Sequence, residues 1–351
     1  MRPAAERHPV HAEGQRHVGL PHLARKLVRA VRRPFEWLLA SLVVWLIPRL
    51  SRRRVLRLAR GIGTLGYRLC GRLRRIGLAN VRAAYGDRLS AREARAIVHG
   101  SFVTGAIVLC DLFWFSREPA RRIRAHVRAV PGSEQLIGIA PHIVATAHFG
   151  NWEMLGKALG VFGAPLTSAA APVKNAVVDR MLGGLREDTG QQIIPREGAI
   201  RGLLRALRAG RRIGLVLDQN VKPEQGGHWV PFFGLPVPVS NAAASLCLRT
   251  DAPIVVWFCR RTNDGDYELR GRRLDPEPGQ AAGEQAVDSL TRRVVAAIEQ
   301  AIREEPGQWL WTYKTWKYIP AGCPEAERYP FYARELGGES EVGSRKSEIG
   351  S

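Results

Sequence analysis

From residue 127 onward, short apolar runs alternate with helical segments, and this alternation constrains the fold more than any other feature of the sequence. The runs that we expect to form strands are 127–130, 143–147, 166–169, 192–194, 213–217, 254–259 and 267–270. The segments that we expect to form helices are 152–159, 175–188, 199–208, 241–248 and 284–303. Strands that alternate with helices form a parallel sheet covered on both faces. The sequence therefore predicts an α/β fold with a mixed, largely parallel sheet flanked by helices.

The composition is that of one large α/β domain with appendages. Hydrophobic residues make up 45% of the 351 residues, which is enough for a sizeable core. The net charge of +21 is typical of a protein that meets nucleic acid, an anionic membrane surface, or acidic substrates and carriers. A genomic bias towards arginine codons would give the same charge. The five cysteines are scattered, without a C-x-x-C pair or a Cys/His cluster, which favours reduced thiols and no metal site.

The first third of the chain is basic and helical in pattern. Residues 1–33 are expected to form a disordered basic tail, and residues 34–125 a helical region that associates with a membrane. Its apolar stretch 35–48 is shorter than the ~20 residues of a bilayer span, and arginines flank it. We interpret this stretch as an interfacial or marginally spanning anchor, with a buried core helix as the alternative. At the other end, residues 335–351 are rich in Gly, Ser and Glu and are expected to be disordered.

Two local motifs lie within the helical region. Gly61-Ile62-Gly63-Thr64-Leu65-Gly66 spells a dinucleotide-binding fingerprint, but no apolar strand precedes it. We interpret its glycines as chance or as sites of close helix packing. Ser90 and Glu93 have the spacing of a capping box and predict a helix start at residue 91.

The candidate catalytic motif is His148-Phe149-Gly150-Asn151-Trp152-Glu153. His148 ends an apolar strand, and Glu153 falls in the first turn of the following helix, at the rim where open α/β sheets bind ligands. The helix dipole stabilises an anion there, so Glu153 can orient the His148 imidazole and favour its protonated form. His148 and Glu153 would then be the base and the orienting group of a catalytic triad. The motif holds no nucleophile, so the attacking hydroxyl would come from the substrate. The alternative is an ordinary His–Glu pair with a structural role.

A second constellation repeats this pattern. The run 213–217 ends at Asp218 and Gln219, so Asp218 shares a rim with His148 if the two strands are neighbours. A turn-capping aspartate is the alternative. Residues 229–236 predict an aromatic loop without a regular period, which lines an apolar slot or packs on the surface. Arg186 and Arg196 are candidates to hold a phosphate, although most arginines in such a chain are solvated.

These residues resemble a known family. The segment 148–153 is similar to the H-x-x-x-x-D/E motif of glycerolipid acyltransferases. The complete sequence of this segment resembles that of the lipid A late acyltransferases. Further matches, in the family's order and spacing, are residues 80–85, 185–186, 195–198, 218–219, 231–234 and 308–311. The resemblance covers most of the chain and implies that residues 126–334 form the acyltransferase domain.

The resemblance implies an activity and a site. His148 would be the general base on an acceptor hydroxyl, with Glu153 orienting it, and the acyl donor would be acyl-acyl carrier protein. The residues implied to bind substrate are Asn151, Trp152, Arg186, Arg196, Asp218, Gln219, Phe232 and Phe233. No cofactor, metal or nucleic acid is expected. The expected partners are the carrier protein, a phosphorylated glycolipid and the cytoplasmic face of the inner membrane.

The chain departs from the family pattern in two places. Ala171-Pro172 stands where the family often has Arg-Pro, and Tyr313-Lys314-Thr315 interrupts a run that is usually rich in His and Arg. The sequence therefore leaves three candidates for the acceptor: a lipid A precursor, a phosphatidylinositol mannoside and a lysophospholipid. Two other classes are weighed against this activity: a metal-dependent hydrolase with His148, Glu153 and Asp218 as ligands, and a basic protein that binds nucleic acid.

Overall fold

The computed structural model describes residues 42, 44–170, 176–195, 197–277 and 283–336. Residues Ile47–Ser351 form one compact unit and Met1–Leu46 another. The predicted tail 1–33, most of the apolar stretch 35–48 and nearly all of the tail 335–351 lie outside the described residues. In the described part of the apolar stretch, Leu42 and residues 44–46 are helical.

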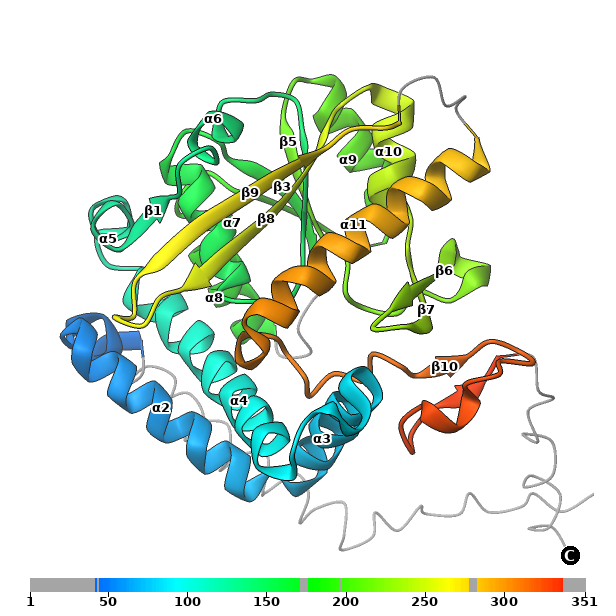
Figure 1. The fold of residues 1–351 in the computed structure, drawn as a ribbon. Helices are drawn as coiled ribbons and strands as arrows, with labels where there is room; N and C mark the ends of the chain where they lie inside the picture. Colours follow the sequence, from blue (N-terminus) through cyan, green and yellow to red (C-terminus); the bar gives the residue numbers. More distant parts are fainter. Residues whose placement is uncertain (1–41, 43, 171–175, 196, 278–282, 337–351) are drawn as a thin grey trace, which may run out of the picture. The chain divides into compact units, whose positions relative to one another are not determined.

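The core of the larger unit is a seven-stranded sheet with the order β1-β9-β8-β2-β5-β3-β4 (Figure 1). Its strands are β1 Val127–Ala129, β2 Ile143–Thr146, β3 Leu166–Ala170, β4 Gln192–Pro195, β5 Arg212–Val216, β8 Ile254–Arg261 and β9 Tyr267–Leu274. Neighbouring strands are parallel except β8 and β9, which are antiparallel. The predicted α/β class and the largely parallel sheet are confirmed, and all seven expected strands are present.

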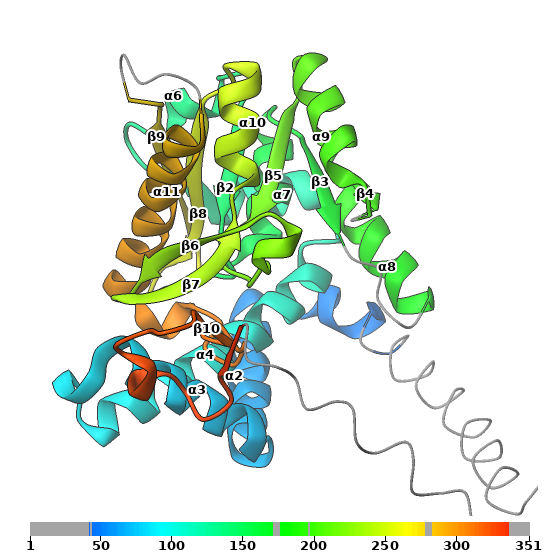
Figure 2. The same ribbon diagram turned by 90° about the vertical axis from the view of Figure 1, so that its right-hand side faces the viewer.

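Helices cover both faces of the sheet. Helices α9 Ala199–Arg208, α10 Ala242–Thr250 and α11 Glu284–Glu304 lie on one face (Figure 2). Their apolar side chains form one buried cluster with alternate strand residues such as Ile143 and Ala145. On the other face lies α7 Trp152–Val161, and α8 Ala176–Glu187 contacts both α7 and β4. The short helices α5 Pro119–His126 and α6 Glu134–Ile137 contact β1 and β9, respectively.

A helical layer formed by α2 Arg52–Leu69, α3 Gly71–Tyr85 and α4 Ala91–Trp114 packs beside the sheet in the same unit. Within the predicted helical region 34–125, α2 and α3 are separated at Cys70. The capping box at Ser90 and Glu93 is confirmed. The apparent dinucleotide fingerprint lies inside α2, and a Cβ on Gly63 would come within 2.5 Å of Val103 Cα in α4. Gly63 therefore serves close helix packing, which was one of the two predicted interpretations, whereas a Cβ on Gly61 would meet no atom within 4 Å.

Helix α4 is the described helix whose length and apolar composition would allow it to cross a membrane. However, 56% of its most apolar window is buried inside the protein, and α4 contacts α2, α3 and α7. Core helices of soluble proteins meet the same criteria, so we describe α4 as a packed helix. The membrane association of residues 34–125 stays a prediction.

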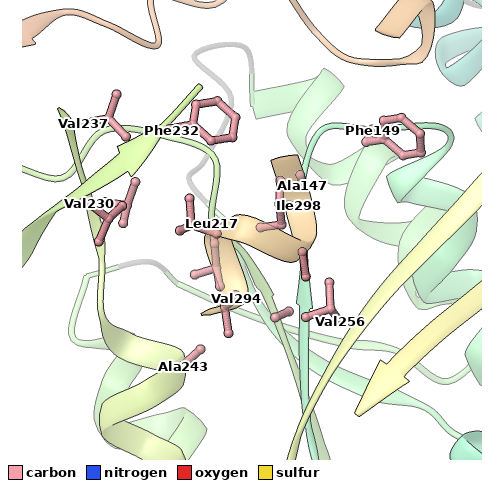
Figure 3. Close-up of a cluster of buried hydrophobic side chains, with 14 of the residues drawn as sticks. Ala147, Phe149, Leu217, Val230, Phe232, Val237, Ala243, Val256, Val294 and Ile298 are labelled. Atoms are coloured by element: carbon pink, nitrogen blue, oxygen red, sulfur yellow. The ribbon is translucent and has the colours of Figure 1, made fainter. Parts of the chain in front are cut away.

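The prediction of an irregular loop at residues 229–236 is wrong. Strands β6 Gly227–Phe232 and β7 Leu235–Ser240 form an antiparallel hairpin, whose turn residues Phe233 and Gly234 have positive φ angles of 53° and 77°. Prolines at 231, 236 and 238 obscured the alternation, because proline is disfavoured inside paired strands. The alternation is nevertheless visible, since Val230, Phe232 and the odd-numbered residues 235–239 are buried, although Pro238 is buried as well. They pack against α11 (Figure 3).

Short elements complete the chain. The 3₁₀ turns are η1 Ile47–Arg49, η2 Gly86–Arg88, η3 Pro223–Gln225, η4 Pro306–Gln308 and η5 Ala326–Arg328. Two-residue strands β10 Tyr318–Ile319 and β11 Arg334–Glu335 pair in parallel near the end of the described chain. All five cysteines are free, and three of them are buried.

Candidate active site

The site is built on the turn between β2 and α7, residues 147–151, which we call the rim turn. Gly150 has a φ of 60°, and a Cβ at this position would lie 2.2 Å from the carbonyl oxygen of Cys259. Only glycine fits, because both the conformation and the approach to β8 exclude a side chain. The N–H of Asn151 donates to the same Cys259 carbonyl over 2.8 Å and anchors the turn to the sheet.

The segment 308–310 fastens the rim turn from the other side. The Gly150 N–H donates to Gln308 O over 3.0 Å, and the Leu310 N–H donates to His148 O over 3.1 Å. The Gln308 side chain in turn exchanges two hydrogen bonds of 2.9 Å with the backbone of Arg261. The C-terminal motif 308–311 is therefore part of the site framework, although sequence reasoning named none of its residues as site residues.

His148 lies beside Asp218, because β2 and β5 are adjacent and parallel, with Thr146 opposite Val216. The His148 Nδ1–H donates to Asp218 Oδ1 over 2.8 Å. Asp218 Oδ2 accepts the His148 backbone N–H at 2.9 Å and the Trp309 indole N–H at 2.8 Å. The prediction that Asp218 and His148 share one rim is confirmed. Trp309 was missed, and its indole N–H adds a third donor to this carboxylate.

The electrostatics of this pair favour a charged imidazole beside an ionised carboxylate. Burial by itself lowers the pKa of His148, but the charge and hydrogen bond of Asp218, together with the charge of Glu153, raise it above its usual 6.5. Burial raises the pKa of Asp218, and the His148 charge and the hydrogen bonds from His148 and Trp309 outweigh it, so the net shift is downward. The Asp218 side chain is only 4% exposed, whereas that of His148 is 20% exposed. The imidazole is thus the reachable member of the pair.

The partner of the imidazole differs from the sequence expectation, which assigned it to Glu153. Both Glu153 carboxylate oxygens accept hydrogen bonds from Arg186 of α8, from Nε at 2.8 Å and from Nη2 at 2.6 Å. Strand adjacency brings Asp218 to the ring, while the first turn of α7 directs Glu153 towards α8. Glu153 acts on His148 through its charge, which contributes to the raised pKa. Its catalytic role stays a prediction.

Asn151 was predicted to bind substrate, but the structure places it in the interior, 1% exposed. Its Oδ1 accepts the Met154 N–H at 2.9 Å, so Asn151 is the N-cap of α7. Its Nδ2 donates to Asp111 Oδ2 at 3.3 Å and to the Tyr267 hydroxyl oxygen at 3.0 Å. Asn151 therefore positions the helix that carries Trp152 and Glu153.

Arg52, Asp111, Asn151 and Tyr267 form a closed group, which we call the Asp111 cluster. Arg52, at the start of α2, donates to both carboxylate oxygens of Asp111 and to Gly265 O. Tyr267 also donates to Asp111, and burial raises the pKa of this phenol so that it stays a neutral donor. Sequence reasoning missed the cluster. The available signal was a single aspartate in the apolar run 109–115, because a buried charge requires partners.

The other predicted residues lie at different depths. The Trp152 ring meets the His148 ring edge-on, with centroids 5.0 Å apart. Gln219 and Phe232 line a cavity of about 10 Å³ beside Asp218, which is about the size of one water molecule. Phe233 is 2% exposed and packs against Tyr85 and Trp311, so it belongs to the core.

Two further candidates bear on what the site can bind. Arg196 and the departure at Ala171-Pro172 lie outside the described residues. Within the described ranges, no group of three or more His, Cys, Asp or Glu side chains could hold a metal ion. The hydrolase alternative, which requires His148, Glu153 and Asp218 as joint ligands, therefore has no ligand set in this arrangement.

A largely parallel α/β sheet that carries a carboxylate-bound histidine at its carboxyl edge defines a candidate acid–base enzyme. The family model described as bacterial lipid A biosynthesis acyltransferase matches residues 24–318 of the chain. The chain belongs to this family and is an acyltransferase.

Individual relatives agree with this assignment. The chain is 24% identical over 314 residues to the lipid A biosynthesis lauroyltransferase of Escherichia coli (strain K12), covering 85% of this chain and 97% of the relative. It is 26% identical over 178 residues to the phosphatidylinositol mannoside acyltransferase of Mycolicibacterium smegmatis, covering 50% of this chain and 56% of the relative. The lipid A biosynthesis palmitoleoyltransferase of Escherichia coli is 25% identical over 183 residues, covering 51% and 57%. The names of these relatives thus refer to acyl transfer in lipid A biosynthesis or to phosphatidylinositol mannoside.

Proposed function

We propose that the protein is a membrane-associated O-acyltransferase that moves a fatty acyl chain from acyl-acyl carrier protein to a hydroxyl of a lipid A precursor or a related glycolipid. The observation that carries this proposal is the reachable His148 imidazole, bound through Nδ1 to the buried Asp218 carboxylate. Family membership and the near-complete coverage of the lauroyltransferase support the acceptor class.

In the proposed reaction, His148 Nε2 takes the proton of the acceptor hydroxyl as its oxygen attacks the thioester carbonyl. Asp218 holds the Nδ1–H and stabilises the imidazolium. The tetrahedral intermediate collapses by breaking the C–S bond, and the leaving carrier thiolate takes the proton from His148. The products are the acylated glycolipid and the free carrier thiol, and no cofactor is required. Proton transfer of this kind contributes about 10²–10⁴-fold in rate.

The start of α7 supports the intermediate in this proposal. The Trp152 and Glu153 N–H groups are the first two of the helix, and such groups have no partner within a helix. They point along the helix dipole towards the rim, where they would bind the oxyanion. The Glu153–Arg186 pair holds α8 against α7 and leaves the Arg186 charge at the same rim, which would attract the carrier or a phosphate.

The mannoside relative favours a second acceptor. It covers half of this chain, and the departures from the family pattern at residues 171–172 and 313–315 leave room for a phosphatidylinositol mannoside or a lysophospholipid. The net positive charge suits each of these acceptors, because each carries a phosphate group and lies in a membrane. We place the enzyme at the cytoplasmic face of the inner membrane, where the carrier protein is available.

Mass spectrometry of host glycolipids tests the proposal directly. A host strain that lacks the protein is complemented with the wild type and with His148→Ala. The wild type is expected to add the mass of one acyl chain to one glycolipid, and His148→Ala is expected to leave that glycolipid unmodified. Equal acylation by both chains would refute the role of His148. Loss of the activity on addition of a metal chelator would instead support the alternative of a metal-dependent hydrolase.

A further inference from the structure

Helix α2 has two apolar faces, and among the residues that the structure describes only one of these faces is covered by protein. Val55, Leu56 and Ala59 are buried against the body of the protein, where α2 packs on α4. A second row consists of Leu58, Ile62, Leu65 and Leu69, which are 40%, 45%, 55% and 73% exposed. Its members are three or four residues apart, so they form one stripe along the helix. We call these four residues the α2 stripe. In Figure 1, α2 lies at the outer edge of the helical layer.

An arginine row runs beside the α2 stripe. Its members are Arg53, Arg54, Arg57 and Arg68, all exposed. Their side chains form no hydrogen bond or ion pair with another described residue. By contrast, Arg292 and Arg303 of α11 each pair with a carboxylate one turn earlier. Helix α2 contains no acidic residue, so no carboxylate within the helix offsets this positive charge.

We propose that α2 lies flat on an anionic lipid bilayer, with the α2 stripe among the acyl chains and the arginine row at the phosphates. An apolar stripe beside a basic row is the pattern of an interfacial helix. Arginine stems cover apolar surface while their guanidinium groups reach the headgroups. A stripe that projects from one convex helix suits a planar surface better than a shaped protein groove. Each basic residue near such a surface strengthens binding roughly fivefold.

This inference deepens the proposed membrane association and adds a contact distinct from the stretch 35–48. It also links the bilayer to the active site. Arg52, the first residue of α2, belongs to the Asp111 cluster, and that cluster holds the N-cap of α7. A bilayer that positions α2 therefore also sets the orientation of the rim turn towards lipid acceptors.

A fluorescent label in the full chain distinguishes whether a lipid bilayer or protein covers the α2 stripe. Cys70 and Cys323, the two cysteines that are not buried, are changed to serine, and one new cysteine carries an environment-sensitive dye. Ile62→Cys places the dye in the α2 stripe, and Arg60→Cys places it on the opposite side of the same helical turn. With phosphatidylglycerol vesicles, the dye at position 62 is expected to shift to the blue and to resist an aqueous quencher. The dye at position 60 should stay in water.

Two outcomes of this experiment overturn the inference. One is a dye at position 62 that stays in water while the chain sediments with the vesicles. The other is a dye at position 62 that is shielded before vesicles are added, because residues 1–41 or a second copy of the chain would then occupy the stripe.

A matched pair of substitutions provides a second measurement. Ile62 in α2 and Ile200 in α9 are both 45% exposed isoleucines on helices. Ile62→Glu is expected to weaken partitioning onto anionic vesicles about tenfold, and Ile200→Glu should leave it unchanged. Equal effects would contradict a specific lipid contact at α2. Turnover of a detergent-dispersed acceptor should stay within about twofold for Ile62→Glu, which separates this test from that of the acyltransfer reaction.

Discussion

The two ends of strand β2 each carry a histidine, and the pKa values of the two side chains are shifted in opposite directions. His142 precedes the strand, is fully buried, and its Nδ1–H donates to Ile139 O over 2.7 Å, while its Nε2 has no hydrogen-bond partner among the described residues. Burial lowers the pKa of His142 to about 4. His148 follows the strand and bonds to Asp218, and its pKa is raised.

The difference shows that burial alone does not make a histidine useful for acid–base chemistry. Burial lowers the pKa of both rings, and at the carboxyl end the carboxylates of Asp218 and, to a smaller extent, Glu153 reverse the shift. Asp218 is available at that end because parallel strands place their carboxyl ends on one rim. The amino end has Arg212 nearby, and its charge lowers the pKa of His142 further. The following predictions test this contrast.

The largest effect is expected for His148→Ala. Removal of the general base should lower kcat by about 10³-fold, within the range for proton-transfer catalysis. His142→Gln is the control at the other end of the strand and should keep kcat within about threefold. Steady-state acyl transfer with both variants checks this prediction. Similar losses in the two variants would show that the ends of β2 do not differ in function.

Asp218→Asn should lower kcat by about 10²-fold, because the neutral amide no longer stabilises the imidazolium. It should also remove the main cause of the raised His148 pKa. Since the base acts in its neutral form, activity rises with pH through that pKa, and the acid limb of kcat/KM in the wild type should lie above pH 6.5. In Asp218→Asn, the limb should move to lower pH.

Glu153→Gln is the comparison for Asp218→Asn. Because Glu153 acts on His148 through charge and bonds directly to Arg186, its loss should cost about tenfold in kcat and shift the acid limb less. A larger loss for Glu153→Gln than for Asp218→Asn would restore the sequence-based pairing of His148 with Glu153.

Asp111→Asn tests a buried carboxylate at the same end of β2 that does not touch the imidazole. It should destabilise the protein by about 3 kcal/mol, because Arg52 would be left without its counter-charge. It should lower kcat severalfold through the cap of α7, while the acid limb stays in place. Urea unfolding and a pH profile measure the two effects. A moved acid limb would mean that the Asp111 cluster belongs to the catalytic pair.

The smallest effect on activity, but a clear effect on stability, is expected for His142→Leu. Between pH 6.5 and about 4, His142 is protonated in the unfolded chain but stays neutral in the folded protein, so lowering the pH destabilises the wild type. Once the pH has fallen below both the unfolded pKa of 6.5 and the folded pKa of about 4, this difference lowers the free energy of unfolding by about 3 kcal/mol. The variant should therefore gain stability relative to the wild type as the pH falls from 7 to 4. Urea unfolding at several pH values checks this slope.

His148 should contribute the opposite slope. Its folded pKa is raised, so its stabilisation is complete below pH 6.5 and is lost as the pH rises through the folded pKa. His148→Ala should therefore remove a stabilisation that is present in acid and absent in alkali. Equal slopes for the two histidines would break the comparison.

Much of the fold could be predicted because its signals are local. The buried strands are short apolar runs, and α11 shows the periodicity of an amphipathic helix over 21 residues. The position of His148 at the end of a strand follows from the same pattern. The hairpin β6–β7 was missed because three prolines interrupt a regular alternation.

The partners within the site depended on contacts between distant residues. Asp218 is 70 residues from His148, and Asp111 is 40 residues from Asn151. Register between parallel strands decides the first contact, and helix packing decides the second. Neither leaves a periodic trace in the sequence, and the nearby Glu153 was the only carboxylate that local spacing could offer to the imidazole.

By itself, the sequence determined the α/β class, the family and the histidine on which the proposed chemistry rests, because these depend on local periodicity and ordered motifs. Tertiary structure decided that Asp218 binds the imidazole, that Glu153 pairs with Arg186 and that Asn151 is a buried cap. The physical reason is that a hydrogen bond depends on distance and direction in space, which the packing of β2, β5, α7 and α8 sets.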